Sequence, residues 1–304
     1  ALAAANRLVG TLAHPLNRAV FAGESGRVTA GYTVLQPRVE ISPRSANRSW
    51  FTRIYSGDVG LDLYSLAVSD VYQDLAGEGI YVGKGIYDVR AFERSIAGQI
   101  PENRLLSHDL LEGLLGRAGL VTDITMIEDY PPNYFAFAQR AHRWIRGDWQ
   151  LLPWLFSTTR EHGRLGLIDV WKIFDNLRRS LLAPTLLALL LAGWTFLPGP
   201  AGAWTGLAVL ALGIPLLTQV IQVLAGGLRS EEPLRAVARP LLLDVLRWLL
   251  ALVFLPYEAL KTLSAIGITL YRLLISRRNL LQWTTAAQAA TKLKREQPGV
   301  VALR

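Results

Sequence analysis

The sequence contains no cysteine, so a disulfide framework, a cysteine-ligated zinc site and a thiol nucleophile are all excluded. Ionisable side chains are also missing from one long stretch, because residues 181–228 include no Asp, Glu, Lys, Arg or His. Hydrophobic residues make up 51% of the chain and charged residues only 18%, which excludes an intrinsically disordered protein. A mean hydropathy of +0.26, together with nine Trp residues, indicates a membrane protein.

The uncharged stretch divides at residues 198–202, which read Pro-Gly-Pro-Ala-Gly. Its first part, 181–197, is close to the minimum length of a membrane span, and its second part, 203–224, is comfortable at roughly 20 residues. We therefore expect two membrane helices joined by a short turn, a hairpin that covers residues 181–225. A hairpin buried in a soluble protein is the alternative, but soluble helices rarely lack a polar face for so long.

Basic residues flank this hairpin on both sides and are absent from its turn. The positive-inside rule places both ends of such a hairpin, and the polar residues 1–180, in the cytoplasm. Residues 241–255 and 262–275 are also apolar. Either both are further short spans, or one of them is an amphipathic helix that lies along the membrane interface. The expected membrane region covers residues 181–276. Residues 277–304 then form a cytoplasmic linker. The flanking basic residues are Arg160, Arg164, Lys172, Arg178 and Arg179 before the hairpin, and Arg229, Arg235 and Arg239 after it.

Charge is distributed unevenly, with 20 basic and 19 acidic side chains in residues 1–180 but 12 basic and 5 acidic in 181–304. The basic excess lies in the apolar part, which argues against a nucleic-acid-binding domain and is typical of Lys and Arg beside membrane helices. The polar part alternates between helix and strand patterns, so we expect an α/β fold with helices on the faces of a sheet. The expected helices are residues 2–12, 67–75, 110–117 and 136–149, and the expected strands are 33–41, 79–82 and 121–127.

Two groups of residues in the polar part have the chemistry of a binding or catalytic site. Gly83, Lys84 and Gly85 let the backbone approach a ligand and present one ammonium group, although a simple turn explains them as well. Asp109 stands where a helix is expected to start. It either caps that helix or serves as a general base at the edge of a cleft.

A third group lies on the expected helix 136–149, where Arg140, Arg143 and Arg146 recur at a spacing of three. Guanidinium groups on one helix face can grip a diphosphate through their forked donors, or they can form a solvated basic face near anionic lipid. Trp144 can stack on a sugar or a base, or pack against neighbouring side chains. These residues alone leave both interpretations open.

The order of these motifs resembles that of processive inverting glycosyltransferases of the cellulose-synthase type. An acidic residue in a Ser/Thr-x-Asp setting is followed by a Glu-x-x-Pro strand, an R/Q-x-x-R-W motif and membrane helices. Longer blocks resemble the glycosyltransferase region of cyclic β-1,2-glucan synthases, and this resemblance covers nearly the whole chain. The blocks are residues 13–18, 35–39, 69–74, 83–89, 106–113, 142–154 and the junction at 280–287.

The resemblance implies that residues 1–180 are the C-terminal part of a GT-A-like glycosyltransferase domain. It implies an enzyme that transfers glucose from UDP-glucose to the 2-hydroxyl of a growing β-1,2-glucan, with inversion at C1. Asp109 falls at the place of the general base, and Arg140 stands where the cellulose-synthase pattern has Gln. The residues that the resemblance assigns to substrate binding are Gly83, Lys84, Gly85, His108, Arg140, Arg143 and Trp144.

One motif of the family, the Asp-x-Asp that binds the metal and the nucleotide diphosphate, is missing from this sequence. In the family it would lie just upstream of the helix that corresponds to residues 6–12. The Mg²⁺ or Mn²⁺ of the family would be held there, and no residue of this chain is assigned as a metal ligand. We therefore expect a fragment of a longer protein that is inactive alone. We expect that protein to be a multi-pass protein of the bacterial inner membrane, with its catalytic part on the cytoplasmic side that the positive-inside rule gives.

The partners expected for this fragment are UDP-glucose, a glucan acceptor, the lipid bilayer and the missing N- and C-terminal regions of the same protein; no nucleic acid is expected. A membrane glycosyltransferase that makes a different linkage is one alternative to this assignment. A non-catalytic scaffold or transporter subunit is another, although it leaves the carboxylate and arginine groups without a role.

Overall fold

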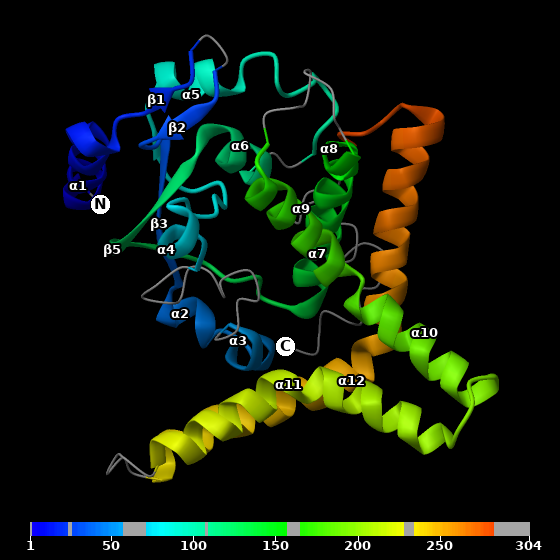
Figure 1. Cartoon of the computed structure of the whole chain (residues 1–304). Helices are drawn as coiled ribbons and strands as arrows, with labels where there is room; N and C mark the ends of the chain where they lie inside the picture. The colour runs from blue at the N-terminus through cyan, green and yellow to red at the C-terminus, as the bar shows by residue number, and fades with distance from the viewer. Residues whose placement is uncertain are drawn as a thin grey trace, which may run out of the picture. The chain divides into compact units, whose positions relative to one another are not determined.

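A computed structural model of the chain describes residues 2–23, 26–56, 71–106, 109–156, 165–227 and 234–282. The chain divides into two units, which are drawn together in Figure 1. The first, here called the α/β unit, consists of Ala1–Leu177 and Ile266–Arg304. The second, here called the helical unit, consists of Arg178–Ala265.

The α/β unit contains short strands and a larger number of helices. The strands are β1 (Val20–Phe21), β2 (Val28–Ala30), β3 (Val34–Ile41), β4 (Ile86–Tyr87) and β5 (Ala118–Glu128). The helices before the membrane region are α1 (Leu2–Ala13), η1 (Pro15–Asn17), α2 (Pro43–Ala46), α3 (Trp50–Tyr55), α4 (Val71–Ala76), α5 (Val89–Ile96), α6 (Asp109–Gly116), α7 (Tyr134–Gln150), α8 (Leu152–Phe156) and α9 (Leu167–Ser180).

The α/β unit contains a three-stranded sheet in the order β4-β3-β5, of which β3 and β5 are labelled in Figure 1. β3 pairs in parallel with β5, from Val34 opposite Ala118 to Ile41 opposite Glu128, and its pairing with β4 is antiparallel. The parallel pair therefore brings Ile41 and Glu128 to one edge of the sheet, where the chain leaves both strands.

Successive side chains of β3 point to opposite faces of the sheet, and both faces are buried, as in a strand that is covered on both sides. Leu35 packs with Leu8 of α1, whereas Val34 packs on the opposite face with Tyr81. A larger apolar cluster joins α6 to α9 through Leu111 and Ile173, both of which are fully buried. Packing against α9 therefore fixes the apolar side of α6, and Asp109 is the first residue of this helix.

Most of the elements expected in the polar part are confirmed, with bounds that differ by a few residues. The strand expected at residues 79–82 is wrong, because this segment is irregular backbone. Gly79 N–H does bond to Ala118 O at 2.7 Å, but Val82 N–H bonds to the side chain of Gln36 instead of a neighbouring strand. Of the helix expected at 67–75, residues 67–70 lie outside the described part of the chain.

The helical unit contains α10 (Leu182–Thr195), α11 (Ala201–Gly227) and most of α12 (Leu234–Leu270), which continues into a π-helical turn at Tyr271–Ser276. Leu186, Ala208 and Leu255, one from each helix, form its buried cluster. Trp248 Nε1–H donates a hydrogen bond to Val209 O at 3.2 Å. The described parts of these helices therefore pack against one another through apolar contacts and very few polar ones.

Within the part of the chain that the structure describes, two helices are long and apolar enough to cross a membrane, at Ala201–Leu224 and Pro240–Ser276. Helix α10 is shorter than the span expected at 181–197, since 14 residues extend only about 21 Å. It reaches the length of a span only when it is taken together with α9, from which it is separated by a bend. Pro256 does not divide α12, although it removes one helical hydrogen bond.

Candidate functional site

The candidate general base lies at the start of α6 and faces a glycine of the loop 77–85. A Cβ atom added at Gly83 would lie 2.8 Å from Asp109 Oδ1 and 2.9 Å from Oδ2, so the carboxylate occupies the space of the missing side chain. Gly83 also has φ of +77°, which disfavours other residues. Two predicted site residues that are well separated in the sequence are thus in direct contact. His108 lies outside the described residues.

Buried polar groups hold this loop against β3. Gln36 is 1% exposed, and its Oε1 accepts a hydrogen bond from Val82 N–H at 3.0 Å. The Nε2 of Gln36 donates to Pro37 O at 2.7 Å, so both ends of the amide are used. A Cβ at Gly85 would come within 2.1 Å of Leu35 O, which shows how closely the loop approaches the strand. Glycine at position 85 is therefore required for backbone approach to β3.

Tyr81 joins the same loop to α6. Its side chain is buried against Gly113, where a Cβ would lie 2.6 Å from the Cβ of Tyr81. Burial, with smaller contributions from the negative charges of Glu112 and Asp109, raises the pKa of Tyr81 to about 12. The phenol is accordingly neutral at pH 7, and the side chain acts as a fixed spacer between the loop and the helix that carries Asp109.

Lys84 does not present a free ammonium group. Its Nζ forms an ion pair with Glu128 Oε2, and both side chains are partly exposed. Glu128 is the last residue of β5 and begins the Glu-x-x-Pro sequence, so this ion pair connects the loop to the edge of the sheet. The ion pair therefore joins two motifs that are far apart in the sequence, the group around Gly83 and the Glu-x-x-Pro motif.

Arg140 and Trp144 of α7 stack on each other. The guanidinium carbon of Arg140 lies 4.5 Å from the ring centre of Trp144 and 5.9 Å from that of Tyr130. Tyr130 follows Glu128 and Asp129, and its backbone N–H donates to Ser45 Oγ at 2.8 Å. Arg143 lies one turn along α7 from Arg140, and both are half-buried. Contacts therefore run from the end of β5 to the R-x-x-R-W motif.

Arg146 has a role that the spacing of the arginines does not predict. It is buried, and its guanidinium group donates to Gln282 O at 2.8 Å and to Leu280 O at 3.3 Å. Gln150 Nε2 donates to the same Leu280 O at 3.0 Å. Burial lowers the pKa of Arg146, with a smaller effect of the nearby Arg272. Arg146 therefore binds the segment that follows α12 and does not share an exposed face with Arg140 and Arg143.

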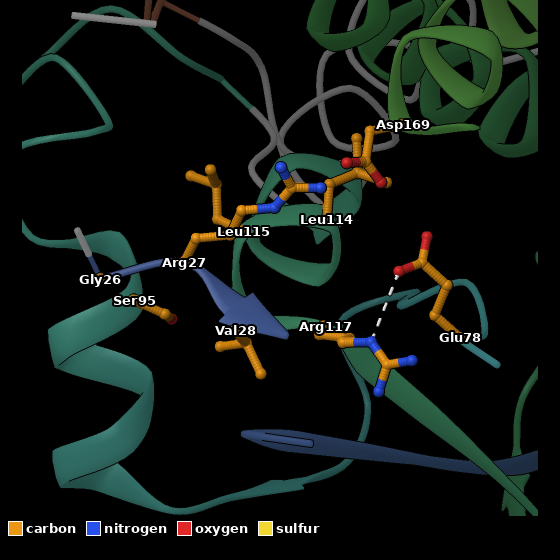
Figure 2. A pocket seen from close by; sticks show the side chains of 9 residues that line it. All are labelled: Gly26, Arg27, Val28, Glu78, Ser95, Leu114, Leu115, Arg117 and Asp169. Carbon is orange, nitrogen blue, oxygen red and sulfur yellow. Dashed lines mark ion pairs between the residues drawn. The ribbon is translucent and has the colours of Figure 1, made fainter. Parts of the chain in front are cut away.

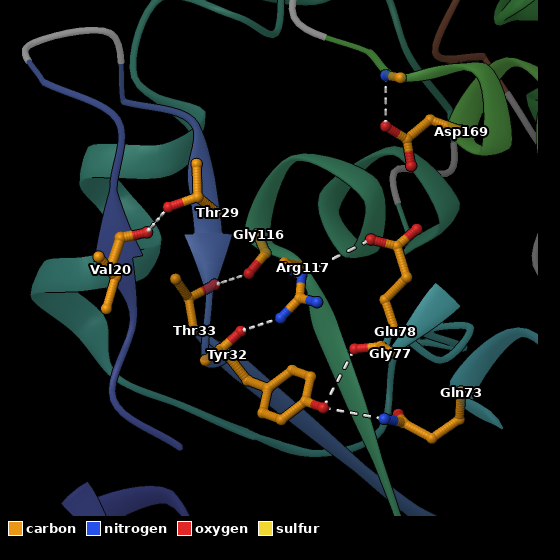
Figure 3. A network of polar contacts seen from close by, with 12 residues as sticks. Val20, Thr29, Tyr32, Thr33, Gln73, Gly77, Glu78, Gly116, Arg117 and Asp169 are labelled. Atoms are coloured by element: carbon orange, nitrogen blue, oxygen red, sulfur yellow. Dashed lines mark hydrogen bonds and ion pairs between the residues drawn. The ribbon is translucent and has the colours of Figure 1, made fainter. Parts of the chain in front are cut away.

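A second charged group lies on the α9 side of the loop. We call it the Glu78 cluster, and it consists of Glu78, Arg117, Asp169 and Lys172. Glu78 Oε1 accepts a hydrogen bond from Lys172 Nζ at 2.8 Å, and Glu78 Oε2 lies 3.8 Å from Arg117 Nε. Figure 3 shows the ion pair between Glu78 and Arg117 and the nearby hydrogen bond between Tyr32 and Gly77. The Gly-Glu-Gly sequence at 77–79 was the only signal of this cluster.

A small cavity adjoins the Glu78 cluster (Figure 2). Glu78, Arg117 and Asp169 line it together with Arg27, so charges of both signs face the same space. Burial and the carboxylate of Glu78 raise the pKa of Asp169 to about 6. The cavity is lined by none of the residues predicted for the substrate site.

Metal ligation was expected upstream of this chain. Among the described residues, no group of three or more His, Asp or Glu side chains is placed to hold a metal ion. Glu128, the carboxylate at the end of β5, is already paired with Lys84. The described residues therefore do not form a metal site of their own.

No protein-family model matches the chain. It is 42% identical over 292 residues to the cyclic beta-(1,2)-glucan synthase NdvB of Rhizobium meliloti (strain 1021). That alignment covers 94% of this chain but 10% of the relative, so the chain spans about a tenth of the length of the protein it matches. The resemblance indicated by the sequence motifs is thereby confirmed, and the chain is homologous to one segment of a cyclic β-1,2-glucan synthase.

Proposed function

We propose that the chain is the acceptor-side and membrane part of an enzyme that synthesises a β-1,2-glucan from UDP-glucose. Identity of 42% to a cyclic beta-(1,2)-glucan synthase supports glucan synthesis. One structural observation supports a catalytic role for this segment: Asp109 is the first residue of α6, and its carboxylate lies directly against Gly83, so two residues that the motifs assign to the site are in contact.

In the proposed reaction, the 2-hydroxyl oxygen of the glucan attacks C1 of UDP-α-glucose. Asp109 accepts the hydroxyl proton as the new C–O bond forms, and the bond between C1 and the UDP oxygen breaks. UDP leaves with the electron pair of that bond, and attack from the opposite side gives the β configuration. A positioned general base of this kind contributes typically about 10²–10⁴-fold to the rate.

Arg140, Arg143 and Trp144 are proposed to form the nucleotide and acceptor side of the same site. The leaving diphosphate gains negative charge, and guanidinium groups supply forked hydrogen-bond donors for it. The stacking of Arg140 on Trp144 fixes both side chains before substrate binds, which reduces the entropy lost on binding. With Lys84 neutralised by Glu128, the described contacts favour a structural role for Lys84 in holding the loop.

The membrane helices are proposed to anchor this domain at the cytoplasmic face of the bacterial inner membrane. Two helices among the described residues are long and apolar enough to span a bilayer. The basic residues before 181 and after 228, and their absence from the turn at 198–202, favour a cytoplasmic location for the α/β unit.

The replacement Asp109→Asn in the full-length synthase tests the proposed base. We expect glucan synthesis to fall by roughly 10²–10⁴-fold while UDP-glucose binding is retained, because the amide cannot accept the proton but keeps the shape of the side chain. The measurement is incorporation of labelled glucose, with binding followed by calorimetry. Asp123→Asn is the matched control, because Asp123 is an exposed carboxylate on β5 that pairs with Arg7.

Near wild-type synthesis in the Asp109→Asn variant would exclude Asp109 as the base. Linkage analysis of the labelled product separates the proposed reaction from its rivals. A product without 1,2 linkages would indicate another membrane glycosyltransferase, and no turnover of any UDP-sugar by the full-length protein would indicate a scaffold.

A further inference from the structure

The loop 77–85 carries Gly83 to the carboxylate of Asp109 without the support of regular secondary structure. Its position depends on side-chain contacts at a few points. Tyr81 packs against Gly113, Val82 N–H bonds to Gln36, and Lys84 pairs with Glu128. These contacts fix the middle and the end of the loop, and its beginning is fixed by Glu78.

Glu78 is held by an ion pair that is almost completely buried. The side chain of Lys172 is 2% exposed and that of Glu78 is 14% exposed, with Nζ and Oε1 separated by 2.8 Å. Lys172 also lies 5.0 Å from the ring centre of Tyr72, which belongs to α4 just before the loop. A buried ammonium group needs both a counter-charge and a hydrogen-bond acceptor, and Glu78 supplies both.

The remaining members of the cluster reinforce this arrangement. Arg117 brings a second positive charge to Glu78, and its Nη1 donates to Gly31 O at 2.9 Å, which ties the group to the residues before β3. Asp169 lies on α9 one turn before Lys172, and its Oδ2 accepts a bond from Gly166 N–H at 2.7 Å. The backbone of the loop adds a contact, because Gly77 O accepts from Tyr32 O–H at 3.1 Å (Figure 3).

We propose that Glu78 and Lys172 are a positioning pair for the glucosyl transfer: their ion pair ties the loop 77–85 to α9 and so keeps Gly83 against the carboxylate of Asp109. The pair touches no reacting atom, and it acts through the loop. This inference rests on the proposed function for its effect on catalysis, whereas the tie between loop and helix is a property of the fold alone.

The experiment uses the full-length synthase with Glu78→Gln, Lys172→Met and both replacements together. The double variant removes both charges of the pair, so neither Glu78 nor Lys172 is left buried without the other, which keeps the test valid if a single variant fails to fold. Asp123→Asn, which breaks an exposed ion pair outside the loop, is the control. Backbone hydrogen exchange of residues 79–85 and glucan synthesis per mole of UDP-binding protein are measured for each.

For Glu78→Gln and for the double variant we expect exchange in residues 79–85 to accelerate and the synthesis rate to fall by roughly tenfold, because small displacements near a reacting group are costly. The KM for UDP-glucose should stay within about twofold, since the resemblance to the family puts residues 83–85 in its acceptor-side loop. The effects of the two single replacements should not add in the double variant. Normal exchange and synthesis are expected for Asp123→Asn.

Unchanged exchange of residues 79–85 in the double variant would overturn the proposed tie. Faster exchange with an unchanged rate per mole of UDP-binding protein would overturn its role in positioning. Both results differ from failure of the proposed function, which would appear as full synthesis by the Asp109→Asn variant while the exchange measurement still reports on the tie.

Discussion

At the scale of single residues, Gly83 meets two requirements that no other residue satisfies together. Its φ of +77° favours glycine, and the Asp109 carboxylate fills the space of a side chain. The residue type at position 83 is therefore set by the neighbouring carboxylate as well as by the turn, and the two effects can be separated experimentally.

The replacement Gly83→Ala should lower glucan synthesis by roughly 10²-fold, because the added methyl group displaces the Asp109 carboxylate. Gly98→Ala is the matched control, since Gly98 has φ of +69° but no atom within 4 Å of an added Cβ. Both variants should lose about 1–2 kcal/mol of unfolding free energy from the positive φ. Equal synthesis by the two variants would show that the contact with Asp109 does not matter for the reaction.

At the scale of elements, α7 combines two different surfaces. Arg140 and Trp144 stack beside the end of β5, whereas Arg146 and Gln150 bind the backbone of the segment after α12. The helix thus links the candidate substrate site to the residues that follow the membrane region. Both surfaces belong to the α/β unit, because residues 266–304 are part of it.

The replacements Arg143→Ala and Arg146→Gln should separate these two surfaces. Arg143→Ala should weaken UDP binding by roughly 10-fold or more through loss of charged donors, and it should leave stability nearly unchanged. Arg146→Gln should cost about 1–3 kcal/mol of stability, because Gln282 O loses its bond from Arg146 and Leu280 O is left with Gln150 as its donor, and it should expose residues 277–282 to proteolysis. Calorimetry of UDP binding and limited proteolysis of the two variants test this division, which would be contradicted by the reverse pattern.

At the scale of the whole molecule, the distribution of charge and hydropathy distinguishes the two units. The uncharged residues 181–228 include α10 and α11, and the candidate spans are Ala201–Leu224 and Pro240–Ser276. Membrane helices keep their backbone bonds internal, which explains why the described part of this unit consists of helices joined by short connections. The proposed orientation follows from the Lys and Arg flanks alone.

Single cysteines introduced in a cysteine-free background test this orientation. Gly202 lies at the start of α11, where an added side chain meets open space, and the proposed orientation puts it on the outer side of the inner membrane. Gly202→Cys should therefore react with a membrane-impermeant maleimide added to cells whose inner membrane is intact. Asn47→Cys, at an exposed position of the α/β unit, should react only after the membrane is permeabilised. Labelling of Asn47→Cys in intact cells would reverse the proposed orientation.

The sequence by itself determined the features that depend on local pattern. Periodic apolar residues predicted β3, β5, α6 and α7, because helix and strand periods are written into each segment. The charge-free residues 181–228 predicted helices for the membrane, and motif order predicted the homology to a glucan synthase. The strand expected at 79–82 failed because its apolar residues are buried by the packing of Tyr81 and not by pairing with a neighbouring strand.

Only the tertiary structure decided which charged and polar groups meet. Asp109 lies against Gly83, Lys84 pairs with Glu128, and Lys172 reaches Glu78 across 94 positions of sequence. Arg146 follows the same spacing as Arg140 and Arg143, yet it turns to carbonyl groups of a segment 134–136 positions away. Spacing along a helix fixes the direction of a side chain, but its partner depends on how the rest of the chain folds around that helix.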